Sequence, residues 1–331
     1  MLVSVQGLRA LAAWLVVFHH FMQVFFDFKS STLMGHLLST RGQVGVDLFF
    51  IISGFVIYVS TAGKHMPTTT FLIHRLARIA PAYWLFTLIT AAIIAFAGDV
   101  MPVYGVSVKE LIYSLLFLPS QNPGGFGLYP ILPVGWSLNF EMLFYTIFAL
   151  SFAVNERYRL WLVLALVTLV CPILAHQPFV SSFYTDPMVY EFVFGLGLGM
   201  LYRRNRLPEG LWVPLATIAI STAFLLNFDD QTPYRLFTWG IPSVLIVSSV
   251  IAMEPWFRRH RWLKHMGDWS YSVYLVHIIV LWSSDYLLRQ RLDLSPYLTF
   301  ALCIPAIMVL SWLSFELIEK RVSGWIKRRL T

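Results

Sequence analysis

Apolar residues run through this chain in long blocks separated by short polar turns, from one end of the sequence to the other. Each block is close to the ~20 residues that a helix needs to cross a hydrocarbon core about 30 Å thick. The pattern therefore predicts an all-α, polytopic integral membrane protein. About ten transmembrane helices are expected, at residues 6–26, 44–62, 71–97, 137–154, 159–175, 187–202, 211–227, 236–253, 269–288 and 297–318.

Two stretches between the third and fourth blocks depart from this pattern. Residues 109–119 form a shorter apolar piece, which predicts a partly inserted or surface helix. Residues 120–135 are rich in Gly and Pro, which mark turns and loops. We expect this loop on the outer side of the membrane, as an ordered lid or a re-entrant stretch.

Composition supports a single membrane domain over residues 1–331, with no appended soluble domain. Hydrophobic residues make up 58% of the chain and charged residues 12%, whereas soluble domains have roughly 25% charged residues. The two cysteines, Cys171 and Cys303, lie in apolar blocks. We expect them to be packing residues rather than a disulfide or a metal pair.

The net charge of +7 would by itself be compatible with a nucleic-acid partner, but the positions of the basic residues indicate a membrane. With the N-terminus in the cytoplasm, 17 of the 24 basic residues fall on the cytoplasmic side and six on the outer side. This asymmetry follows the positive-inside rule. We therefore expect an even number of spans with both termini cytoplasmic, and no nucleic-acid partner.

Arg9 and His20 share one face of the first block. Eleven helical steps of about 100° leave them roughly 20° apart around the axis and about 16 Å apart along it. Ionisable groups at membrane depth are costly, so they usually face the protein interior and mark function. Histidine can take and return a proton near neutral pH, which predicts His20 as a proton-transfer group. The alternative is a histidine that packs between helices.

Arg75 and Arg78 are spaced i, i+3, so both guanidinium groups lie on one side of a helix at the expected cytoplasmic entrance. Arginine offers permanent charge and bidentate hydrogen bonds, which suit phosphate. The alternative is that these arginines only set the orientation of the helices in the membrane, as basic residues on the cytoplasmic side commonly do. Together with Arg9, the pair indicates a cytoplasmic anionic cofactor such as an acyl-CoA.

Ser137, Glu141 and Tyr145 repeat every four residues and line one face of the fourth block, near its outer end. A carboxylate there would orient the His20 imidazole and pair with its protonated form. It would equally well hold two helices together, and the spacing leaves both interpretations open.

Other polar residues in the apolar blocks carry weaker signals. Asp47 is either a partner of the site or a helix N-terminal carboxylate. His277 either lines the same cavity or forms an interhelical hydrogen bond. Glu191 and Glu316 are intramembrane acids with no assignment, and no cluster has the ligand spacing of a metal site.

With these segments laid out, the chain resembles the membrane acyltransferase-3 family over nearly all 331 residues. Within this family, the motif Trp136-Ser-Leu-Asn-Phe-Glu-Met142 and the short length of the chain are most similar to those of the exopolysaccharide O-acetyltransferases of soil bacteria. The resemblance is carried by five motifs in order: Arg9-x10-His20, Gly45-Val-Asp47-Leu-Phe-Phe-Ile-Ile-Ser53-Gly54-Phe, Arg75-x-x-Arg78-Ile-x-Pro81, Trp136-Ser137-Leu-Asn139-Phe-Glu141-x-x-Phe144-Tyr145, and Ser270-Tyr271-Ser-x-Tyr274-Leu-x-His277.

The resemblance implies a multi-pass O-acyltransferase of the bacterial cytoplasmic membrane with ten core helices. It implies acyl-CoA, most simply acetyl-CoA, as a donor from the cytoplasm and no permanently bound cofactor. The implied acceptor is a hydroxyl of a surface polysaccharide or its lipid-linked precursor. An acyltransferase of this size works in the lipid bilayer either alone or beside polysaccharide synthesis or export machinery, and the sequence leaves both alternatives open.

The resemblance also suggests roles for individual residues. Arg9, Arg75 and Arg78 match positions linked to donor binding, and His20 matches the catalytic histidine, which acts either directly or through an acyl-histidine. His19 departs from the family, where an aromatic residue is usual. Glu141 is expected to assist His20. The expected substrate contacts or supporting residues are Asp47, Ser137, Tyr145 and His277.

A proton-coupled transporter of a glycan or small anion is the main alternative, because intramembrane Arg, His and Glu also build proton pathways. Transporters often contain two related halves. This chain shows no such internal symmetry.

Overall fold

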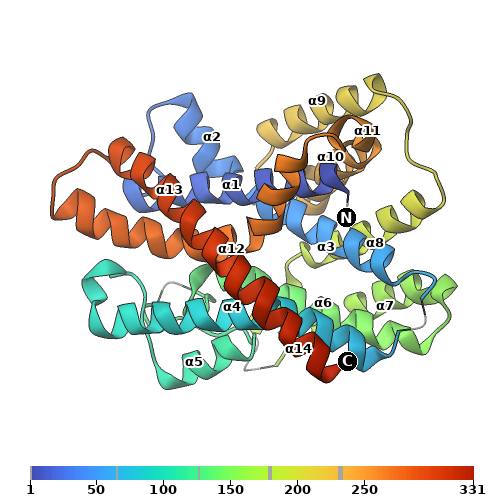
Figure 1. Cartoon of the computed structure of the whole chain (residues 1–331), viewed down its shortest axis with the longest axis horizontal. Helices are drawn as coiled ribbons and strands as arrows, with labels where there is room; N and C mark the ends of the chain where they lie inside the picture. Colours follow the sequence, from blue (N-terminus) through green and yellow to red (C-terminus); the bar gives the residue numbers. More distant parts are fainter. Residues whose placement is uncertain (1, 65, 126, 178–180, 230–233) are drawn as a thin grey trace.

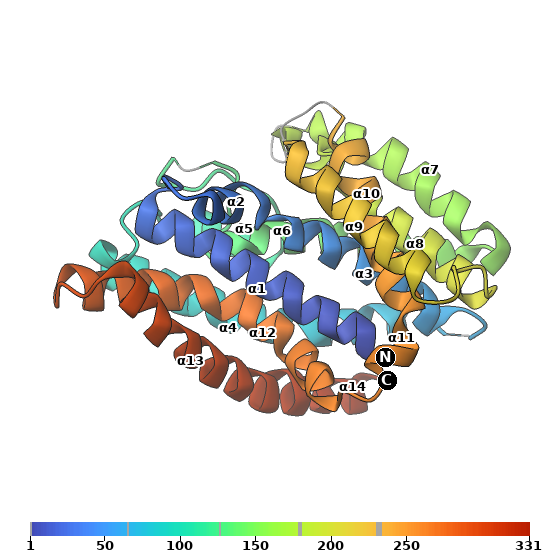
Figure 2. The ribbon, with the colours of Figure 1, turned by 90° about the horizontal axis from the view of Figure 1, so that it is seen from above.

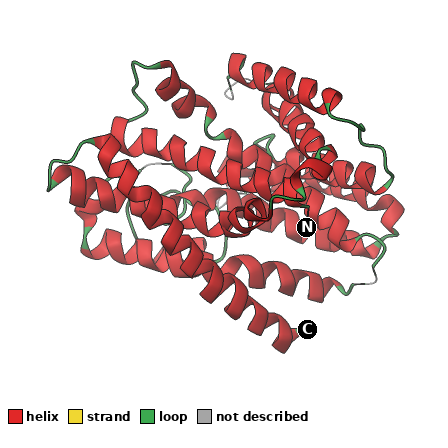
Figure 3. Ribbon diagram, turned by 45° about the horizontal axis from the view of Figure 1, so that its top comes forward, coloured by secondary structure: helices red, strands yellow, loops and turns green. Residues whose placement is uncertain are grey.

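The computed structural model describes residues 2–331 apart from 65, 126, 178–180 and 230–233, and all regular structure in these ranges is helical (Figure 3). The helices are α1 (Val3–Phe26), α2 (Leu33–Arg41), α3 (Val44–Thr61), α4 (Thr68–Phe96), α5 (Val108–Leu115), α6 (Trp136–Leu150), α7 (Glu156–Ala175), α8 (Val189–Arg203), α9 (Trp212–Asn227), α10 (Ile241–Ala252), α11 (Glu254–Phe257), α12 (Arg261–Ser284), α13 (Pro296–Ser314) and α14 (Ser323–Leu330). Wider π-helical turns lie at Leu236–Gly240, Asp285–Gln290 and Phe315–Val322, and short 3₁₀ turns at Gly98–Val100, Pro133–Gly135, Ser151–Ala153 and Ser181–Thr185.

A helix lies at each of the ten positions that the apolar blocks predict, which confirms an all-helical membrane protein (Figure 1). Six helical segments of the described chain are long and apolar enough to cross a bilayer. They are α1, α3, α4, α7, α12 together with the π-helical turn Asp285–Gln290, and α13 continued into α14. The others at predicted positions have 12 to 16 residues, short of the ~20 needed. The number ten and the side of the termini therefore stay predictions. The short helix expected before the loop is α5.

Helix α1 packs against both α3 and α12 (Figure 2), and glycines make this close packing possible. A Cβ added at Gly45 of α3 would lie 2.2 Å from the Ala12 carbonyl oxygen. One added at Gly267 of α12 would lie 2.2 Å from the Gln6 carbonyl oxygen. Small residues let helix backbones approach in this way inside membranes. The two contacts hold α1 on either side of Arg9.

Helices α3 and α8 cross at a second pair of glycines. A Cβ at Gly54 would lie 2.1 Å from the Phe192 carbonyl oxygen, and one at Gly195 would lie 2.1 Å from the Ile51 carbonyl oxygen. The crossing sets the position of α3, which contributes residues to the site.

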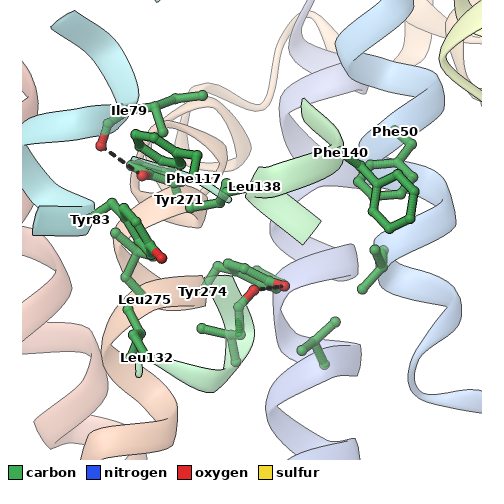
Figure 4. Close-up of a cluster of buried hydrophobic side chains, with 14 of the residues drawn as sticks. Phe50, Ile79, Tyr83, Phe117, Leu132, Leu138, Phe140, Tyr271, Tyr274 and Leu275 are labelled. Atoms are coloured by element: carbon green, nitrogen blue, oxygen red, sulfur yellow. Dashed lines mark hydrogen bonds between the residues drawn. The ribbon is translucent and has the colours of Figure 1, made fainter. Parts of the chain in front are cut away.

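Aromatic and aliphatic side chains from α3, α4, α6 and α12 form the core beside the site (Figure 4). Two buried tyrosines of α12 bind backbone carbonyls across this core. Tyr271 donates its hydroxyl to the Ile79 oxygen at 2.9 Å, and Tyr274 donates to the Val134 oxygen at 2.8 Å. Buried hydroxyls are costly unless they are hydrogen-bonded. These bonds fix α12 to α4 and to the turn that precedes α6.

Candidate active site

Two pockets lie along α1, and Val46 and Tyr274 line both of them. We call the one that contains Arg9 the arginine pocket and the one that contains His20 the histidine pocket. The space open to the centre of a water molecule is about 70 Å³ in the arginine pocket and about 730 Å³ in the histidine pocket. A narrow charged pocket and a wide polar one therefore meet within the helix bundle.

The arginine pocket brings together the three arginines predicted for donor binding. Arg9 is 7% exposed and donates from Nη1 to the Gln6 amide oxygen at 2.9 Å. Arg75 donates from Nη2 to the Ser60 hydroxyl at 3.0 Å, and its guanidinium lies 5.2 Å from the ring centre of Phe71. Arg78, one helical turn beyond Arg75, also lines this pocket. Three guanidinium groups in one partly buried pocket make a site for an anion.

Glu141 lies in the arginine pocket, where it accepts hydrogen bonds from two hydroxyls. Ser53 of α3 donates to its carboxylate at 2.8 Å, and Tyr145 donates to the same oxygen. Ser137 lines the pocket as well and shares a 2.8 Å hydrogen bond with the Tyr274 hydroxyl. The repeat of every four residues on α6 therefore does face one pocket.

The expected pairing of Glu141 with His20 is wrong. Glu141 binds Ser53 and Tyr145, whereas His20 lines the histidine pocket and contacts another histidine. The reason is tertiary: α6 packs against α4, α7 and α8, so its polar face reaches the arginine pocket rather than the far end of α1.

His277 of α12 takes the place beside His20 that was predicted for the carboxylate. Its Nδ1 lies 3.0 Å from the Val273 carbonyl oxygen, which can only accept, so Nδ1 carries the proton. In a neutral imidazole Nε2 is then an acceptor, and it lies 3.1 Å from His20 Nδ1. His20 Nδ1, also 3.0 Å from the Val16 oxygen, is therefore the donor. This hydrogen-bond chain leaves the lone pair of His20 on Nε2.

The histidine pocket has polar and aromatic walls from several segments. Besides His20, it is lined by His19, His36, Tyr104, Tyr129 and Trp136. Burial raises the pKa of Tyr129, so its hydroxyl stays a neutral donor at physiological pH. Tyr129 belongs to the Gly- and Pro-rich loop, which thus forms part of the pocket wall.

Asp47 lies in a buried ion cluster rather than at the surface of either pocket. Arg235 places Nη2 2.8 Å from the Asp47 carboxylate and Nη1 3.0 Å from that of Glu191. Both carboxylates are fully buried, and the Arg235 guanidinium lies 5.6 Å from the ring centre of Trp239. The cluster joins α3, α8 and the turn before α10. Sequence reasoning did not single out Arg235, which is one of the six basic residues on the expected outer side.

Comparisons with known proteins give a consistent result. Residues 2–316 match the acyltransferase-3 family model, described as an acyltransferase domain. The chain is 35% identical over 261 residues to the exopolysaccharide production protein ExoZ of Rhizobium meliloti (strain 1021), covering 77% of this chain and 81% of that protein. It is 28% identical over 313 residues to the acyltransferase MdmB of Streptomyces mycarofaciens, covering 84% and 78%. No solved structure is significantly similar.

Proposed function

Because this chain belongs to the acyltransferase-3 family and is therefore a membrane acyltransferase, we propose that it transfers a short acyl group from acyl-CoA to a sugar hydroxyl. Acetyl is the expected group. The acceptor is a cell-surface polysaccharide or its lipid-linked precursor, and the enzyme works in the bacterial cytoplasmic membrane. The similarity to an exopolysaccharide production protein supports that acceptor. The transporter considered from the sequence is set aside, because the family model that the chain matches is described as an acyltransferase domain.

One observation carries the proposal: an arginine-lined pocket meets a histidine-lined pocket at Val46 and Tyr274. Acyl-CoA has an anionic phosphate end and an uncharged thioester end. Its phosphates suit Arg75 and Arg78, with Arg9 further along the path. The narrow space of the arginine pocket suits the slender chain that leads to the thioester, whereas the wider histidine pocket suits a sugar.

His20 is the proposed general base. With its proton held on Nδ1, the Nε2 lone pair takes the proton of the acceptor hydroxyl as the oxygen attacks the thioester carbonyl. The carbon–sulfur bond breaks, and the leaving thiolate receives that proton from Nε2. The products are an O-acyl sugar and free CoA. His277 keeps the productive tautomer, as the orienting residue of a catalytic triad does.

The test is transfer of radiolabel from acetyl-CoA into extracted polysaccharide by membranes that carry the wild type, His20→Ala or His176→Ala at matched expression. His176 is exposed at the end of α7, so its variant controls for losing a histidine. We expect label with the wild type and His176→Ala, and at least ~100-fold less with His20→Ala. Full transfer by His20→Ala would refute the role of His20. No transfer by the wild type would refute acetyl-CoA as donor.

A further inference from the structure

The C-terminal helix α14 packs along the first half of α4, the helix that carries Arg75 and Arg78 (Figure 1). The Ser323 hydroxyl donates to the Ala77 carbonyl oxygen, and the Thr331 hydroxyl lies 3.4 Å from His74 Nε2. This helix lies beyond residues 2–316, which match the family model. Any contribution of α14 to the site is thus a property of this chain that the family match does not supply.

Lys327 lies on the face of α14 that meets α4. Ser323, Lys327 and Thr331 are spaced by four residues, and such residues share one side of a helix. Because Ser323 and Thr331 both contact α4, Lys327 lies between these contacts. It is half-buried, whereas Arg328 and Arg329 are exposed.

The charges around Lys327 are of the same sign. Arg75 and Arg78 are its charged neighbours, and none of the three forms an ion pair with a carboxylate among the residues that the structure describes. Two carboxylates attract the arginines from beyond ion-pair distance: Glu319 acts on Arg78, and Glu141 acts on Arg75. Glu319 accepts a 2.5 Å hydrogen bond from Ser272. Neither carboxylate acts on Lys327.

Two other lysines of the chain do have acidic partners. Lys320 is 2.9 Å from Glu316, and Lys264 is 3.2 Å from Asp268. Like charges that are gathered and partly buried repel one another unless an anion binds between them. The cluster of Arg75, Arg78 and Lys327 is therefore built for an anion with more than one negative charge.

We propose that Lys327 binds the 3′-phosphate of the donor's adenosine unit, so that α14 forms the outer edge of the donor site. The inference rests on the proposed function, because it takes acyl-CoA as the ligand. With the thioester directed toward His20, the diphosphate lies at Arg75 and Arg78, and the 3′-phosphate lies beyond it on the α14 side. An ammonium group acts as a point charge and suits such a terminal phosphate.

The experiment measures the dissociation constants of CoA and of 3′-dephospho-CoA by calorimetry, with purified full-length protein in vesicles of neutral lipid. Wild type, Lys327→Gln, Lys327→Arg and Lys320→Gln are compared, and equal melting temperatures establish folding. We expect Lys327→Gln to weaken CoA binding about 5- to 20-fold, as for loss of a partly screened charge-assisted hydrogen bond. Lys327→Arg retains most of the affinity, and Lys320→Gln binds as the wild type does.

The comparison of 3′-dephospho-CoA with CoA decides whether Lys327 binds the 3′-phosphate. Binding of 3′-dephospho-CoA should be equal in the wild type and Lys327→Gln, because the partner of Lys327 is missing from that ligand. An equal loss for both ligands would overturn the proposal. So would wild-type affinity in Lys327→Gln, or an effect of Lys327→Gln that appears only in vesicles containing phosphatidylglycerol, which would assign the lysine to a lipid headgroup. If the wild type binds neither ligand, acyl-CoA itself is the wrong donor, and the proposed function falls with it.

Discussion

Replacing Gly195 by alanine tests whether the crossing of α3 and α8 holds the arginine pocket in shape. The new Cβ would lie 2.1 Å from the Ile51 carbonyl oxygen and 2.8 Å from the Phe55 amide nitrogen. Ordinary carbon–oxygen contacts are about 3.3 Å or longer. Both obstacles are backbone atoms of a helix, so neither can rotate away, and the helices must separate by about 1 Å.

This separation has an energetic and a functional consequence. Overpacking of this kind costs typically 1–3 kcal/mol, and the better helix propensity of alanine offsets only about 1 kcal/mol. Ser53 adjoins the crossing and donates to Glu141 at 2.8 Å, so a shift of α3 also lengthens a hydrogen bond within the arginine pocket. We expect Gly195→Ala to lower both the free energy of unfolding and the rate of acyl transfer.

Gly197→Ala is the matched control, two residues along the same helix. A Cβ at Gly197 meets no atom within 4 Å, so alanine there should be neutral or stabilise the helix by about 0.5–1 kcal/mol. Reversible unfolding of the purified variants in mixed micelles gives the free energies, and the radiolabel assay gives the rates. Equal stability and equal transfer in the two variants would refute the argument that backbone contact at this crossing shapes the site.

Two further predictions concern buried polar groups. Arg235→Met leaves the carboxylates of Asp47 and Glu191 buried without their cation, and we expect a loss of about 3–5 kcal/mol in the same unfolding assay; a loss below about 1 kcal/mol would show that the cluster is not held by its charges. His277→Phe removes the acceptor of the His20 Nδ1 proton, and we expect kcat to fall about 10- to 100-fold with little change in KM for acetyl-CoA. A rise in KM with unchanged kcat would instead indicate that His277 contributes to donor binding.

The three arginines were predictable because helical periodicity is a local rule. Arg75 and Arg78 share a helix face at any position in the fold, and Arg9 was singled out by its depth in an apolar block. That they line one pocket depends on how α12 packs against both α1 and α4, which helical periodicity does not determine. That Glu141 and Tyr145 share one face of α6 was likewise predictable. That Glu141 lies in a different pocket from His20 was not.

The sequence by itself determined that this chain is an all-helical membrane protein with charged and polar residues on particular helix faces. Long apolar blocks fix helices in a bilayer, and a spacing of three or four residues fixes which side chains share a face. Only the tertiary structure decided the partners across helices: His277 rather than Glu141 beside His20, and Arg235 between Asp47 and Glu191. Those pairings depend on close glycine contacts and helix crossings that join residues far apart in the chain, where no local pattern applies.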